Sequence, residues 1–229
     1  SVEWLTSPTN SSQSDTLQVK STVLVNYPEF WYDLSPSKIF NVNMKLMKLL
    51  SFMQRVSTGK VVLAFIFPAI IVYFIMLLYT IPQVSAYAPG INLFDLSPTG
   101  YSFEYAIKLL DTLGSDGREM YLYWQLPLDF IYPGLFAGSC SLLLSWLFLT
   151  TQKMNSKLFY FCYIPVAAGL FDYFENIFIV SILTSYPNVS EVSISLASTM
   201  TIVKSVLTTA FFVLLIIGVI LNLKKKLLQ

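Results

Sequence analysis

Four long apolar segments with few charges constrain this chain more than any other feature. They cover about residues 61–81, 121–149, 158–183 and 193–221. As a helix, each segment is long enough to cross a hydrocarbon core of roughly 30 Å, which requires about 20 apolar residues. Only 12% of the 229 residues are charged, about half the share typical of a soluble domain. The sequence therefore predicts an all-α, polytopic membrane protein with a bundle of four transmembrane helices.

Lysine and arginine are distributed unevenly along this chain, and such a bias predicts the orientation of a membrane protein. The segments before the first span, between the second and third, and after the fourth are basic: Lys45, Lys48, Arg55, Lys60, Lys153, Lys157, Lys224, Lys225 and Lys226. The segments on the other side carry only Lys108 and Arg118, among several acidic residues. Because the number of spans is even, we expect both termini on the cytoplasm-like, positive side.

The bundle itself is expected to occupy residues 61–222, and the flanking segments differ from it in composition. Residues 1–43 form a flexible polar tail with an aromatic cluster at Tyr27–Tyr32, able to pack on a partner or to lie in a headgroup layer. Residues 44–60 place leucines at helical spacing opposite a basic face, which predicts an amphipathic helix on the membrane surface. A cytoplasmic extension of the first span is the alternative. Residues 223–229 form a basic tail.

Four ionisable residues lie inside the predicted spans: Asp129, Asp172, Glu175 and Lys204. A charge at the centre of a membrane helix costs at least about 2.5–3.5 kcal/mol on insertion scales, so such residues face the bundle interior and find partners. All four lie about eight to eleven residues from the outer ends of their spans, which at roughly 1.5 Å per residue places them in one layer. We therefore expect one shared cluster in which Lys204 contacts Asp172 or Glu175.

Asn176 joins this candidate cluster because it shares a helix face with Asp172 and Glu175, at i, i+3, i+4 spacing. Three carboxylates around one lysine leave an excess of negative charge. Either one carboxyl group is held neutral, or Arg118 reaches in from the outer loop. The cluster then serves in one of two ways: it locks the helices together, or it forms a site for ions, protons or a lipid head group.

The long outer loop, residues 83–120, supplies the candidate contributors Glu104 and Arg118, and Tyr121 follows it at the start of the second span. Within this loop, Phe103–Leu113 has the pattern of a short amphipathic helix that ends at Gly114. Alternatively, the loop charges do no more than solvate this helix.

The sequence lacks the residues on which several kinds of chemistry depend. It contains no histidine, which removes imidazole as a base or ligand, and its two cysteines, Cys140 and Cys162, lie in apolar runs without metal-ligand spacing. It contains no Gly-rich phosphate loop and no nucleophile–histidine pair. The net charge of +1 gives no indication of nucleic-acid binding. We therefore expect no metal, no cofactor and no nucleic-acid partner.

Four short motifs occur along the chain: Gly114-Ser-Asp-Gly117-Arg118-Glu-Met-Tyr121, Asp129-Phe-Ile-Tyr-Pro133, Asp172-Tyr-Phe-Glu175-Asn176 and Thr201-Ile-Val-Lys204. Together they resemble a family of small four-span membrane proteins, mostly bacterial, whose function is uncharacterised. The resemblance covers about residues 58–222 and leaves out the N-terminal tail. It implies that the Gly-Arg turn, the acidic residues and Lys204 belong together, and it implies no activity.

The leading functional hypothesis is a non-enzymatic helical-bundle protein, an accessory subunit of a membrane assembly, with the bilayer and other membrane subunits as partners. One alternative is an enzyme or carrier for an outer-leaflet lipid or prenyl substrate, with Asp129, Asp172 and Glu175 as acid/base groups. Another is a proton- or cation-conducting element that uses the same carboxylates. A cavity that reaches Glu175 would favour the enzyme, whereas a dry, fully paired cluster would favour the subunit.

Overall fold

The computed structural model describes residues 51–52, 55–151 and 158–227. In this part of the chain every regular element is a helix. Four helices are long and apolar enough to cross a membrane: Gly59–Ser85, Phe103–Thr150, Tyr160–Ser185 and Glu191–Leu227. The prediction of an all-α fold with four membrane-length helices is confirmed. The tail 1–43 and most of the predicted surface helix 44–60 lie outside the described residues, so both stay predictions.

The first membrane-length helix contains a wider π-helical turn near its end. It runs from α3 (Gly59–Ile75) through the π-helical segment η2 (Met76–Thr80) into α4 (Ile81–Ser85). A π-turn adds one residue to a helical turn and shifts the side chains that follow it. The last residue of η2, Thr80, is buried and faces the second helix.

The second membrane-length helix is preceded by a separate short helix. Within α5 (Phe103–Met120), Gly114 has φ 64° and ψ −172°, which breaks the element in two. The short helix therefore ends at Gly114, as the sequence predicted. Residues after Gly114 are helical again and lead through η4 (Tyr121–Gln125), a second π-helical segment, into α6 (Leu126–Thr151). The helix therefore begins before Tyr121, the predicted start of the span, because the charged residues before Tyr121 lower the hydropathy without ending the helix.

The third helix consists of η5 (Leu158–Tyr163), a 3₁₀ segment, and α7 (Ile164–Ser185). The fourth helix, α8 (Glu191–Leu227), has 37 residues and is about 55 Å long at roughly 1.5 Å per residue. It thus exceeds a hydrocarbon core and continues past the predicted end at 221. The three lysines expected in a basic tail lie in its last turn, where positive charge interacts favourably with the helix dipole.

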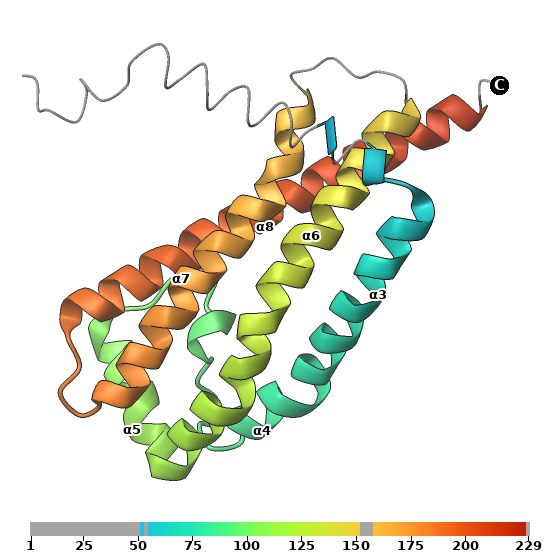
Figure 1. The fold of residues 1–229 in the computed structure, drawn as a ribbon. Coiled ribbons are helices and arrows are strands. Elements are labelled where there is room, and N and C mark those ends of the chain that lie inside the picture. The colour runs from blue at the N-terminus through green and yellow to red at the C-terminus, as the bar shows by residue number, and fades with distance from the viewer. Residues whose placement is uncertain (1–50, 53–54, 152–157, 228–229) are drawn as a thin grey trace, which may run out of the picture. The chain divides into compact units, whose positions relative to one another are not determined.

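The helices α6 and α7 occupy the middle of the bundle (Figure 1). α7 packs against both α6 and α8, whereas α3 packs against α6. The helix α5 and the loop before it lie at one end of the bundle, away from the end of α8 (Figure 1). Their apolar side chains meet α7 and α8 in a buried core that includes Phe94, Leu109, Leu113, Tyr121, Ile179 and Ile182.

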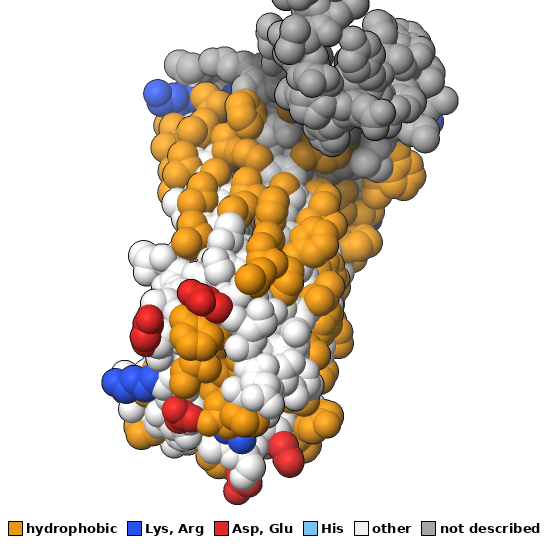
Figure 2. All heavy atoms as spheres, turned by 90° about the vertical axis from the view of Figure 1, so that its left-hand side faces the viewer, with side chains coloured by type: hydrophobic (Ala, Val, Ile, Leu, Met, Phe, Trp, Pro, Cys, Tyr) orange, Lys and Arg blue, Asp and Glu red, His pale blue; other side chains and the backbone are white. Residues whose placement is uncertain are grey.

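The surface of the described residues is apolar along the helices and charged at the α5 end, as Figure 2 shows for one face. Large apolar side chains of the first helix are strongly exposed, with Leu63, Phe67 and Leu78 between 67% and 71% accessible. Soluble monomers rarely expose apolar patches of such extent. This distribution matches the sequence expectation of a hydrocarbon surrounding.

Candidate functional site

Lys204 on α8 contacts two carboxylates of α7. Its Nζ lies 3.2 Å from Oδ1 of Asp172 and forms a second ion pair with Glu175. The two carboxylates are three residues apart, which places them one helical turn apart on one face of α7. The side chain of Glu175 is fully buried, whereas those of Lys204 and Asp172 are 16% exposed. The structure thus brings together the lysine and the carboxylates that the sequence predicted to pair.

The second oxygen of Glu175 also has a partner. The hydroxyl of Thr201 donates a hydrogen bond of 2.7 Å to Oε1 of Glu175, while Lys204 pairs with Oε2. Thr201 and Lys204 are three residues apart on α8, so both reach α7 from one side. An unpaired carboxylate is very costly in a low-dielectric surrounding. Here the buried carboxylate is paired at both oxygens.

Asp129 on α6 belongs to a neighbouring set of hydrogen bonds. Its Oδ2 accepts a hydrogen bond of 2.8 Å from Nε2 of Gln125. The hydroxyl of Thr80 in turn donates to Oε1 of Gln125. Thr80 and Gln125 are the last residues of the two π-helical segments, η2 and η4. The two π-turns therefore meet through side chains, and this contact links the first two membrane-length helices.

Asn176 binds the backbone of α6, for a reason that lies in Pro133. In a helix the N–H of residue i bonds the carbonyl of residue i−4, and proline has no N–H. Pro133 therefore leaves the carbonyl of Asp129 without its helical donor. Nδ2 of Asn176 donates to that carbonyl oxygen at 2.7 Å. Pro133 thus frees the carbonyl oxygen four residues before it, and Asn176 of α7 binds that oxygen. This accounts for both the spacing from Asp129 to Pro133 and the asparagine after Glu175.

The predicted single cluster consists of two adjoining sets. No ion pair of the described residues joins Lys204 to Asp129, and the two sets meet where Glu175 and Asn176 follow each other on α7. Asp129 is still close enough to Lys204 and Asp172 for electrostatic interaction. The matching depths were informative, but depth alone did not decide which side chains touch.

The predicted approach of Arg118 to the carboxylates is wrong. Its Nη1 donates a hydrogen bond of 2.8 Å to the carbonyl oxygen of Leu110, and its guanidinium carbon lies 4.2 Å from the ring centroid of Tyr186. The break at Gly114 leaves the last carbonyls of the short helix without helical donors. Arg118 donates to one of these carbonyls, and for this reason its side chain points toward the short helix. Arg118 therefore does not balance the charge of the carboxylates.

The other loop candidates differ in how they relate to the site. Glu104 is exposed and lies in the first turn of α5, where negative charge interacts favourably with the helix dipole. Among the described residues, no ion pair joins Glu104 to Lys204. Tyr121 is fully buried, and its hydroxyl donates to Oδ1 of Asp95. The outer loop thus contacts the bundle interior through Tyr121.

Sequence reasoning missed two loop residues near the site, Asp95 and Tyr101. Asp95 lies in η3 (Phe94–Leu96) and acts electrostatically on Lys204 and on the carboxylates of α6 and α7. The ring of Tyr101 packs 4.8 Å from that of Phe94, and its backbone N–H donates to Oγ of Ser198 at 2.8 Å. Burial, and then the charge of Glu175, raise the pKa of Tyr101, so its hydroxyl stays protonated. The apolar residues around Asp95 were the one sequence signal for a loop that turns inward.

No known protein family matches the chain, and no curated protein or solved structure matches it either. Among the described residues, no group of three or more His, Cys, Asp or Glu side chains is arranged to hold a metal ion.

Proposed function

We propose that this protein is a non-enzymatic membrane protein whose buried polar residues lock four helices together, and that it serves as an accessory subunit of a membrane assembly. The observation that carries this proposal is the state of Glu175. It is fully buried, and both of its oxygens are paired, with Lys204 and with Thr201. A catalytic or transporting carboxylate has to reach a substrate or ion, whereas a carboxylate that holds helices together does not.

The connectivity of the polar contacts supports the same role. Thr80 joins the first membrane-length helix to Gln125 of the second. Asn176 joins α7 to the backbone of α6. Lys204 then joins α8 to α7. A path of polar contacts therefore crosses all four helices, and in hydrocarbon such contacts supplement van der Waals packing between helices.

The alternatives need more access than the site provides. An enzyme acting on a lipid or prenyl substrate requires an acid or base within reach of the substrate. The Asp172 side chain is 16% exposed and already pairs with Lys204, and Asp129 is 7% exposed. A proton- or cation-conducting element would need the same closed ion pairs to open. We therefore favour the structural role.

The proposed orientation places both termini on the positive side of the membrane, and it predicts the labelling of introduced cysteines. Two single-cysteine variants, Lys225→Cys and Asp116→Cys, should be made separately in a chain whose own cysteines are replaced by serine. In sealed cells, a membrane-impermeant maleimide should label residue 116 from outside and residue 225 only after the cytoplasmic side is exposed. Labelling of residue 225 from outside would contradict the orientation.

The subunit role predicts that the N-terminal tail matters for partners and not for folding. Deleting residues 1–43 should leave the melting temperature of the purified bundle in detergent within a few degrees of that of the full chain. The same deletion should reduce co-purification of partner subunits from native membranes, as quantified by mass spectrometry. A deletion protein that no longer folds, or that retains every partner, would contradict this assignment of the tail.

A further inference from the structure

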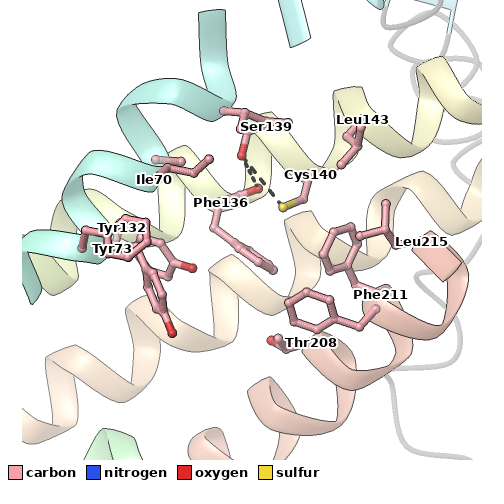
Figure 3. A pocket seen from close by; sticks show the side chains of 14 residues that line it. Ile70, Tyr73, Tyr132, Phe136, Ser139, Cys140, Leu143, Thr208, Phe211 and Leu215 are labelled. Carbon is pink, nitrogen blue, oxygen red and sulfur yellow. Dashed lines mark hydrogen bonds between the residues drawn. The ribbon is translucent and has the colours of Figure 1, made fainter. Parts of the chain in front are cut away.

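A groove between α3, α6 and α8 offers a binding site apart from the ion pairs. Its volume is about 510 Å³, within the range of roughly 300–1,000 Å³ common for small-molecule sites. The fourteen residues that line it include no charged side chain. Most are apolar, such as Ile66, Ile70, Phe136, Phe211 and Leu215, and Figure 3 shows several of them around the opening. The lining therefore favours an uncharged, largely hydrocarbon occupant.

Three hydroxyl groups from three different helices lie at one end of this groove: Tyr73 of α3, Tyr132 of α6 and Thr208 of α8 (Figure 3). The ring centroids of Tyr73 and Tyr132 are 5.7 Å apart, so the two phenol rings are in contact. The apolar side chains of Leu143 and Leu215 lie toward the other end (Figure 3). The groove thus has a polar end and a hydrocarbon end.

These hydroxyls have no hydrogen-bond partner within the part of the chain that the structure describes, in contrast to Ser139 of the same groove. The Ser139 hydroxyl donates to the carbonyl of Phe136 at 3.3 Å. Hydrocarbon supplies no water to replace a missing partner, and an unpaired hydroxyl there is unfavourable. A ligand oxygen at this end of the groove would accept hydrogen bonds from hydroxyls that otherwise have none.

We propose that this groove binds an uncharged lipid with an oxygen head group, a long-chain alcohol or ketone. The hydroxyls of Tyr73, Tyr132 and Thr208 hold its oxygen, and its chain lies along the apolar side chains between α3 and α8. A charged head group is disfavoured because the lining provides no ion to pair with it. The site goes beyond the subunit role and does not depend on it.

Photolabelling tests the proposal directly. The full chain, in phosphatidylcholine vesicles, is exposed to a hexadecanol analogue that carries a diazirine on its chain, and labelled peptides are identified by mass spectrometry. We expect saturable labelling of peptides from α3, α6 and α8 around the groove. Unlabelled hexadecanol should compete, whereas palmitate and hexadecane should compete at least about tenfold less well, because the first is charged and the second has no oxygen.

Hydroxyl deletion supplies the decisive comparison. The combined variant Tyr73→Phe, Tyr132→Phe and Thr208→Val keeps side-chain size and should reduce labelling by roughly tenfold or more, since it removes up to three hydrogen bonds. The matched control Tyr79→Phe and Tyr123→Phe removes hydroxyls from exposed tyrosines outside the groove and should leave labelling unchanged.

Three results would overturn the site: no saturable labelling of the wild-type chain, equal competition by hexadecane, or unchanged labelling in the hydroxyl-deletion variant. Each would indicate ordinary contact with bulk lipid. If the combined variant fails to fold, Ile70→Trp replaces it. Ile70 is 46% exposed and lines the groove, so a larger side chain fills the groove with little effect on packing, and labelling should be lost. Retained labelling in Ile70→Trp would equally overturn the proposal.

Discussion

Replacing Lys204 by methionine is expected to destabilise the bundle by about 3–5 kcal/mol, the typical effect of removing one partner of a buried ion pair. Methionine preserves most of the side-chain length, so the loss is mainly electrostatic. Glu175 would remain fully buried with one oxygen unpaired, and Asp172 would lose its ion pair. The measurement is chemical or thermal unfolding in detergent, compared with Lys108→Met. Lys108 is exposed, so its replacement should have little effect.

Companion substitutions identify which carboxylate bears most of this loss. Adding Glu175→Gln to Lys204→Met should recover more stability than adding Asp172→Asn, because Glu175 is fully buried and Asp172 is 16% exposed. A loss below about 1 kcal/mol for Lys204→Met, the size typical of an exposed pair, would show that the ion pairs do not lock the helices. A stable double variant that no longer co-purifies with partners would indicate a functional role as well.

Replacing Gly169 by alanine is expected to destabilise the bundle by about 1–3 kcal/mol, the usual cost of overpacking. Gly169 of α7 packs so closely on α6 that a Cβ would lie 2.8 Å from the carbonyl oxygen of Pro133 and 3.1 Å from the Cβ of Ala137. A backbone oxygen cannot rotate away as a side chain can, so α6 and α7 have to separate. The measurement is again unfolding in detergent.

Gly138→Ala is the matched control for this prediction. It lies on α6, and a Cβ there would meet its nearest neighbour, Phe65, at 3.7 Å, an ordinary contact. Alanine also favours a helix over glycine by about 1 kcal/mol, so this variant should be as stable as the wild type or more stable. Equal stability losses at Gly169 and Gly138 would show that helix packing at Gly169 is not the cause.

Several features of this protein were determined by local sequence. Charge-poor apolar runs predicted four membrane-length helices, because the free energy of placing a segment in hydrocarbon is a sum over its own residues. Gly114 marked the end of the short outer helix, because glycine readily adopts positive φ. The similar depths of Asp172, Glu175 and Lys204 followed from the constant rise of a helix, and depth limits which charges can meet.

Tertiary structure decided the partners within that layer. Depth leaves the rotation of each helix and the path of the loop undetermined, so Asp129 was grouped with Lys204 although its carboxylate bonds Gln125. Arg118 donates a hydrogen bond to the Leu110 carbonyl oxygen. That oxygen lies near the end of a helix, and so becomes available, only because Gly114 ends the helix. Asp95 comes close through a loop fold that has no periodic signal. The groove between α3 and α8 also depends on how the helices diverge, which no single segment specifies.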